Sequence, residues 1–168
     1  MNISCVGSEK YDSEKVKTWL SEYRSRSRDI ETQDEMLRRL NARMTSTSAQ
    51  DLNGMPHSNN TPSDKMAMMV YRKEKIEGKL KRLIELQNDQ CDVIEEIISC
   101  LRNVDERSVI QFRYLSDLNW DEVSCSMFGK NDDFEDRKES YLRRSTKAHG
   151  RALNNIARIL NERHIETE

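Results

Sequence analysis

Apolar residues recur every third, fourth or seventh position through most of the chain, which is the spacing of one helix face. The first such run spans about Asp12 to Met44, and within it Tyr23, Ile30 and Leu37 keep a seven-residue step. A stripe this narrow, with charged residues on the other faces, is typical of a coiled-coil seam. We therefore expect a long first helix that pairs with another helix.

The periodicity disappears between Thr45 and Asp64, where Ser, Thr, Asn, Gly and both prolines gather. This composition predicts a linker at 45–64 that ends the first helix. Ser63 or Asp64 is the expected N-cap of a second long helix that runs to about Arg102, because a short side-chain oxygen can accept a hydrogen bond from an unpaired N–H. To bury its stripe, each long helix must pair with the other, with a second copy of the protein or with a partner.

Three shorter helical segments follow a break at Asn103 and Val104. The first is expected to begin at Asp105 and to bury a broad apolar set. A turn at Ser116–Asn119 separates it from a helix over Trp120–Phe128, for which Gly129 is the expected left-handed C-cap. The last helix is predicted over Glu139–Leu160, with these residues on its buried side: Leu142, Ala148, Ala152, Leu153, Ile156, Ile159 and Leu160.

Two short helices followed by a third with a basic face are the parts that a helix-turn-helix requires. Five glycines and two prolines in 168 residues permit long helices and disfavour a turn-rich sheet. The expected fold is therefore all-α: long N-terminal helices, as a coiled-coil hairpin or dimer, over 1–102, and a helix-turn-helix DNA-binding domain over 103–168.

The small net charge of −2 conceals two opposed segments. Residues 121–136 carry six acidic side chains and one basic one, whereas residues 140–164 carry six basic side chains, histidines apart, and one acidic one. The acidic stretch within Lys130–Ser140 is either a partner surface or, as we favour, the first turn of the last helix, where the helix dipole stabilises negative charge.

The basic segment supplies a candidate recognition helix. Such a helix keeps one face free of core packing and fills it with groups that contact phosphates and base edges. Arginine offers a planar fork to guanine, and lysine neutralises phosphates. The predicted DNA-binding residues, which share one broad face by helical spacing, are Arg143, Arg144, Thr146, Lys147 and Arg151.

Small residues lie among these basic positions. Ala148, Gly150 and Ala152 are expected to let the last helix approach the helix of Trp120 and Val123 closely. Gly150 costs about 1 kcal/mol relative to alanine inside a helix. A reason of packing, or of close approach to DNA, is therefore expected for it; the alternative is a glycine that sequence drift has left where it is tolerated.

The stretch "DERSVIQFRYLSDLNWDEVSCSMFG", followed by "RRSTKAHGRALNNI", resembles the region-four DNA-binding domain of sigma-70 type transcription factors. It is most similar to the small sigma-like regulators of Gram-positive phages and prophages, the ArpU and RinA type late-gene activators and their relatives. These relatives also carry an N-terminal helical region and a "G-M-P-x-S" linker, here Gly54–Ser58.

The resemblance implies that Arg143, Arg144, Thr146 and Lys147 contact promoter DNA. It also implies that a support helix contains Glu106, Arg107, Arg113 and Tyr114. Two departures are a longer connection over Lys130–Ser140 and Ser124 in place of the family's alanine.

Other classes of function find little support in the sequence. Cys5, Cys91, Cys100 and Cys125 lack C-x-x-C spacing, the three histidines lack ligand spacing, and no glycine-rich phosphate loop is present. We therefore expect no metal, no cofactor and no enzymatic activity. No apolar run reaches the length of a signal peptide or a membrane span, so a cytoplasmic location in a bacterial host is expected.

These features predict a sequence-specific regulator of phage or prophage genes, most simply an activator. The expected partners are double-stranded promoter DNA, RNA polymerase and a second copy of the chain. The first 102 residues contain few aromatic side chains to stack on melted DNA, so the chain should not open promoters unaided. The alternative hypothesis is a coiled-coil adaptor or assembly protein that binds other proteins without DNA contact.

Overall fold

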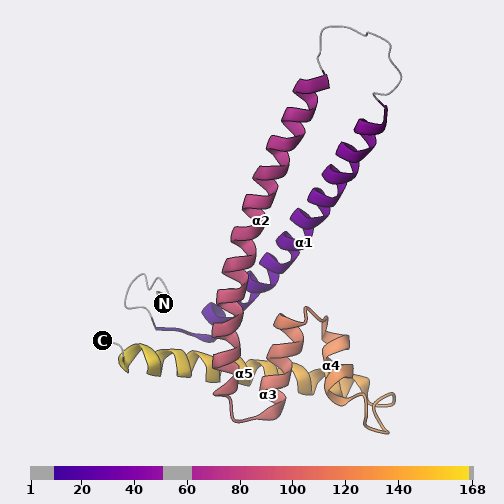
Figure 1. Ribbon diagram of the computed structural model, residues 1–168. Coiled ribbons are helices and arrows are strands. Elements are labelled where there is room, and N and C mark those ends of the chain that lie inside the picture. The colour runs from indigo at the N-terminus through magenta and orange to yellow at the C-terminus, as the bar shows by residue number, and fades with distance from the viewer. Residues whose placement is uncertain (1–9, 51–61, 167–168) are drawn as a thin grey trace. The chain divides into compact units, whose positions relative to one another are not determined.

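A computed structural model describes residues 10–50 and 62–166, and every regular element within these ranges is helical. In chain order the elements are α1 (Ser13–Gln50), α2 (Pro62–Ser99), α3 (Val104–Ile110), a π-helical turn η1 (Gln111–Leu115), α4 (Trp120–Phe128) and α5 (Lys138–Glu166). Figure 1 labels the helices. The all-helical class is thus confirmed for the described residues. No helix among them is both long and apolar enough to cross a membrane.

Both long helices extend into the segment predicted to be a linker, whereas α2 ends at Ser99, before the predicted Arg102. α1 continues past Met44 because the hydroxyls of Thr45 and Ser46 donate to the carbonyls of Asn41 and Arg43, both at 3.0 Å, and are thereby accommodated in the helix. α2 begins at Pro62, since proline fits the first position of a helix, where the N–H would be unpaired. The predicted linker therefore retains only residues 51–61, which lie outside the described residues together with the Gly54–Ser58 motif.

The described residues form two compact units. The core unit comprises residues 10–24 and 90–166, and the hairpin unit comprises residues 25–50 and 62–89. The domain boundary predicted at residue 102 had assigned the first residues of α1 and the last residues of α2 to the N-terminal region. The structure instead groups these ends with α3, α4 and α5, because their apolar residues belong to the same cluster.

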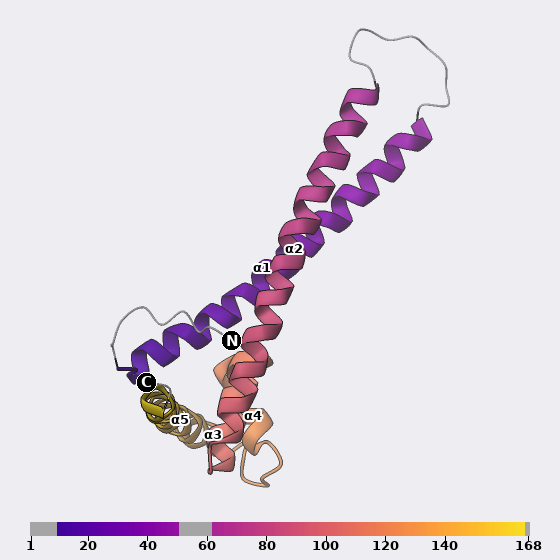
Figure 2. The ribbon, with the colours of Figure 1, turned by 60° about the vertical axis from the view of Figure 1, so that its left-hand side comes forward.

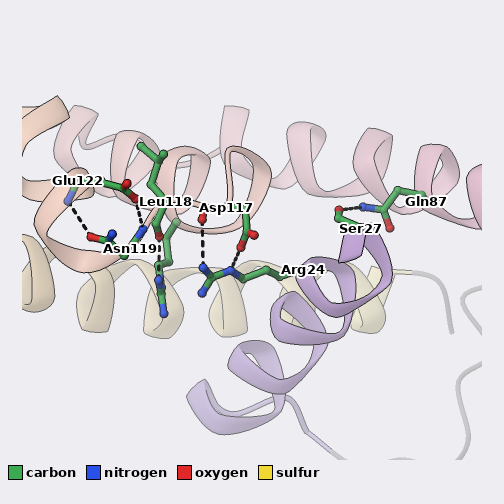
Figure 3. A network of polar contacts seen from close by, with 8 residues as sticks. Arg24, Ser27, Gln87, Asp117, Leu118, Asn119 and Glu122 are labelled. Atoms are coloured by element: carbon green, nitrogen blue, oxygen red, sulfur yellow. Dashed lines mark hydrogen bonds and ion pairs between the residues drawn. The ribbon is translucent and has the colours of Figure 1, made fainter. Parts of the chain in front are cut away.

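The hairpin unit consists of two antiparallel helical segments of the same chain, which lie side by side in both views (Figures 1 and 2). The amide of Gln87 in α2 donates to the hydroxyl of Ser27 in α1 at 2.6 Å, as Figure 3 shows. Ile30, Leu37 and Leu40, which belong to the predicted stripe of α1, are half-buried. The described parts of α1 and α2 therefore pair within one chain.

The core unit is built around one apolar cluster to which every helix contributes. Its fully buried side chains include Leu20 from α1, Ile97 from α2, Ile110 from α3, Val123 from α4 and Ile156 from α5. α5 packs against both α3 and α4. These contacts leave the opposite face of α5 to solvent.

Polar contacts fix the short helices at their ends. The side chain of Asn103 accepts from the amide of Asp105 at 2.8 Å and so caps α3. Asn119 and Glu122 form a capping box at the start of α4, which Figure 3 shows. In the turn between these helices Asp117 has a positive φ of 53°, and Arg24 of α1 binds both its carboxylate and its carbonyl oxygen.

The prediction of a left-handed Gly129 is wrong. Its φ is −62° and its ψ is −12°, within the right-handed region. Glycine is needed there for another reason: a Cβ atom would lie 2.5 Å from the carbonyl oxygen of Cys125. Close backbone approach therefore selects this residue.

Candidate nucleic-acid interface

α5 has a buried and an exposed face. Ser145, Ala148, Ala152, Leu153 and Ile156 face the core and are at most 4% exposed. The hydroxyl of Ser145 donates to the carbonyl of Tyr141 at 3.1 Å, so this buried polar group is satisfied within the helix. The basic side chains project from the other face and have no part in the apolar cluster.

Four of the five predicted contact residues line one open groove. They are Arg143, Arg144, Lys147 and Arg151, and the groove is completed by Ser140 of α5 and by Asn103 and Asp105 at the start of α3. Thr146 is exposed but is not among the groove residues, and its hydroxyl donates to the carbonyl of Arg143 at 3.0 Å. The structure therefore brings four of the predicted side chains together and leaves the fifth on a neighbouring part of the helix.

Two carboxylates in the first turn of α3 hold two of these arginines. Arg144 donates to Asp105 at 3.0 Å, and its guanidinium lies 4.6 Å from the centroid of the Phe128 ring. Arg151 lies 3.8 Å from a carboxylate oxygen of Glu106. These contacts position the two arginines on either side of Lys147 along α5. Lys147 follows Arg144 by three residues and precedes Arg151 by four.

Glu106 is the more buried of the two carboxylates. It is 5% exposed and accepts a hydrogen bond from the amide of Asn155 at 2.8 Å. A buried carboxylate requires such partners, because desolvation penalises the charged form. Glu106 therefore links α3 to α5 and orients Arg151, whereas the sequence had indicated only a place in the support helix.

Lys147 and Arg143 have the greatest freedom to bind an anion. Lys147 is exposed and forms no ion pair within the described part of the chain. Arg143 pairs with Glu139 one turn earlier at 2.7 Å, and their side chains are 70% and 79% exposed. An exposed pair of this kind contributes only a few tenths of a kcal/mol, so a phosphate can displace Glu139 at little cost.

The predicted role of Gly150 in helix packing is wrong. Gly150 is exposed, and a Cβ atom built on it would meet nothing within 4 Å. It lies between Lys147 and Arg151 on the basic side of α5. Close approach of DNA and a merely tolerated glycine stay as the two explanations of Gly150, whereas Ala148 and Ala152 are fully buried as expected.

A buried polar cluster connects the inner face of α5 to the shorter helices. The hydroxyl of Tyr114 in η1 and Nε2 of His149 are hydrogen-bonded at 2.9 Å, and the rings of Trp120 and His149 pack at an interplanar angle of 83°. Burial, followed by the nearby charges of Arg113 and Lys17, lowers the pKa of His149 to about 4. His149 is therefore neutral at pH 7.

Arg113 supports the same cluster from the π-helical turn. Its guanidinium lies 5.0 Å from the Trp120 ring centroid and donates to the carbonyl of Leu118 at 2.8 Å. Arg107 of α3 likewise donates to the carbonyl of Leu101 at 2.7 Å. Glu106 and Arg107 lie in α3, and Arg113 and Tyr114 lie in η1. Their contacts join these two elements to the neighbouring ones.

Of the acidic stretch only Glu139 lies in the first turn of α5, so the favoured interpretation is wrong for the other acidic residues. Asp132, Asp133, Glu135 and Asp136 precede the helix, which begins at Lys138. Asp133 accepts from the Tyr141 hydroxyl at 2.7 Å and from Arg137 at 3.0 Å, and these two hydrogen bonds lower its pKa. The acidic residues thus belong to a folded connection.

Phe134 anchors this connection to the rest of the core unit. It is 7% exposed, and its ring packs against Tyr141, which in turn stacks on Phe128. The sequence interpretation did not include Phe134 or Tyr141. The available signal was one aromatic residue, Phe134, within an otherwise polar connection, with Tyr141 following in the first part of α5.

Comparisons with protein families, curated proteins and solved structures find no match to the chain. Within residues 10–50 and 62–166 no group of three or more His, Cys, Asp or Glu side chains is arranged to hold a metal ion. Cys91, Cys100 and Cys125 are free thiols. The basic groove on α5 is therefore the site from which a function is best argued.

Proposed function

We propose that this chain is a sequence-specific DNA-binding regulator of transcription. In this proposal α3, η1 and α4 support α5 as a helix-turn-helix, and the N-terminal half of α5 lies in the major groove of a duplex. The observation that carries the proposal is the gathering of Arg143, Arg144, Lys147 and Arg151 on the face of α5 that has no part in the core.

The contacts of each side chain suggest a division of roles. Arg143 can exchange Glu139 for a phosphate or for a guanine edge, since both groups accept its planar fork. Arg144, held by Asp105, presents its guanidinium in a fixed orientation suited to one base edge. Lys147 and Arg151 neutralise phosphates, and Gly150 lets the backbone of α5 approach the duplex.

The sigma-like motif adds a biological context to this proposal. It favours action at phage or prophage promoters, with the α1–α2 pair available for contacts with other proteins such as RNA polymerase. The adaptor hypothesis also predicts contacts between the α1–α2 pair and other proteins, but it does not explain the exposed basic face. Duplex binding therefore separates the two hypotheses.

The decisive experiment is footprinting on the genomic DNA that flanks the protein's own gene. The wild type should protect a discrete site, and a double variant, Arg143→Ala with Lys147→Ala, should lose protection while its circular dichroism is unchanged. Arg158→Ala is the matched control. Arg158 lies on the same helix and pairs with Glu162 four residues later at 3.6 Å, but it is about 22 Å beyond Arg143 along the axis.

The dependence on salt provides a second criterion. The three side chains that can neutralise phosphates, Arg143, Lys147 and Arg151, give a slope of log K against log salt of about −3 per subunit, and the double variant should reduce the magnitude of this slope by about two. Unchanged protection in the double variant would mean that another face contacts DNA. Absence of DNA binding at any salt concentration would instead favour the adaptor.

A further inference from the structure

The hairpin unit carries an apolar groove with a cationic rim on one side of the α1–α2 pair. Its apolar residues are Met36 and Leu40 of α1 and Ile76 of α2, and Met36 remains 50% exposed. Four basic side chains complete the lining: Arg39, Arg43, Arg72 and Lys75. Such a groove suits an apolar side chain that is flanked by carboxylates.

Charge is segregated along the same unit. Residues 36–46 and 65–82, which include the groove, carry ten basic and two acidic side chains. Residues 25–35 and 83–89 carry two basic and six acidic ones. If two copies of the hairpin unit packed side by side in the same direction, like charges would face each other. If they packed in opposite directions, each cationic half would face an anionic half.

The anionic half also offers an apolar side chain on the matching flank. Leu86 is 54% exposed and follows Lys75 and Lys79 by eleven and seven residues, so the three share one side of α2. Asp89 lies within one turn of Leu86, and Asp29 precedes Met36 by seven residues on α1. Leu86 lies about 15 Å along the axis from Ile76, so it cannot enter the groove of its own chain.

We propose that the occupant of this groove is a second copy of the chain, bound antiparallel through the hairpin unit. Leu86 of each copy inserts between the helices of the other, and Asp29 and Asp89 face Arg72 and Lys75. A twofold axis makes the contact twice, which doubles the buried surface. The proposal is independent of DNA binding, because it uses no residue of α5.

Charge reversal tests the proposal on the full-length protein by sedimentation equilibrium over about 1–100 μM. The wild type should dimerise, and more weakly at high salt. Arg72→Glu with Lys75→Glu should weaken self-association at least tenfold, as should Asp29→Lys with Asp89→Lys. An equimolar mixture of these two variants should recover a dimer, because the reversed groove of one then meets the reversed end of the other.

Leu86→Gln tests the apolar contact and should weaken dimerisation about tenfold. Ile84→Gln is the matched control: Ile84 is 40% exposed but lies about 200° around the same helix, and its replacement should have no effect. A protein that stays monomeric throughout the concentration range overturns the proposal. So does association that the charge reversals leave unchanged, or that the mixture of variants does not recover.

Discussion

The two units are built from the same two long helices, yet they bury their side chains very differently. In the core unit α1 contributes Val16 and Leu20 at 0% exposure, and α2 contributes Ile94 and Ile97 at 1–2%. In the described part of the hairpin unit only Gln87 is buried, and the stripe residues are half-exposed. Two helices alone cannot cover a side chain on all sides, whereas α3, α4 and α5 supply the missing walls.

Truncation of one apolar side chain in each unit should reveal this difference in burial most strongly. Ile156→Ala in the core unit should lower the free energy of unfolding by about 3 kcal/mol, because the cavity cannot be filled by solvent. Leu80→Ala in the hairpin unit should cost about 1 kcal/mol, since Leu80 is already partly solvated. Urea titration followed by circular dichroism measures both, and equal losses would refute the contrast.

Acid should destabilise the core unit through His149. Its pKa is about 4 in the folded state and near 6.5 in the unfolded chain, so below pH 6.5 the unfolded state binds the additional proton. Stability should therefore be complete above pH 6.5 and fall by about 2–3 kcal/mol as the pH decreases to about 4.

The His149→Gln variant isolates this effect because glutamine does not titrate. Unfolding free energies measured for wild type and variant between pH 4 and 7 should differ in slope, with the variant flatter. Parallel curves would show that His149 is not the titrating group. Hydrogen exchange can then measure whether the amides of the hairpin unit, which lie far from His149 in sequence, respond to the same change in pH.

Removal of one buried hydroxyl should stabilise the core unit. Ser124 is 3% exposed, and its oxygen has no hydrogen-bond partner among the described residues. Ser124→Ala should raise the free energy of unfolding by about 1 kcal/mol, because it removes an unpaired polar group and improves helix propensity. The midpoint of thermal unfolding checks this result, and a lower midpoint would mean that the hydroxyl has a partner.

Two exposed glycines, one in each unit, provide the finest comparison. A Cβ atom on Gly78 or on Gly150 would meet nothing within 4 Å, so each Gly→Ala change should stabilise its helix by about 0.5–1 kcal/mol. Only Gly150→Ala should weaken binding to a duplex, since only Gly150 lies on the proposed recognition face. Fluorescence anisotropy with labelled DNA separates the two variants, and equal affinities would remove Gly150 from the interface.

The sequence predicted the helices and the basic face well because both depend on local spacing. Lys147 and Arg143 lie as expected, since side chains three or four residues apart share a face in any helix. The carboxylate partners of Arg144 and Arg151 were not predicted. Asp105 and Glu106 lie some forty residues earlier in the chain, and hydrophobic periodicity carries no information about which helices meet.

Polar residues in the core were the second feature that the sequence did not predict. His149 and Ser145 look like parts of a polar surface in the sequence, but each is buried because a specific partner satisfies it, Tyr114 in one case and a backbone carbonyl in the other. Gly129 shows a related difficulty, because the sequence cannot distinguish a left-handed glycine from one selected by close approach of the backbone. The details that hydrogen bonds decide therefore required the fold.

Tyr11 and Asn161 exchange two hydrogen bonds, of 2.8 and 2.9 Å, between the first described residues and the far end of α5. During synthesis the segment 25–89 leaves the ribosome complete, and its two helices can pair at once. Residues 10–24 must wait until α5 has emerged, because Asn161 and the other α5 residues near them are translated much later. The core unit is thus completed only after α5 has been synthesised, 150 residues after Tyr11.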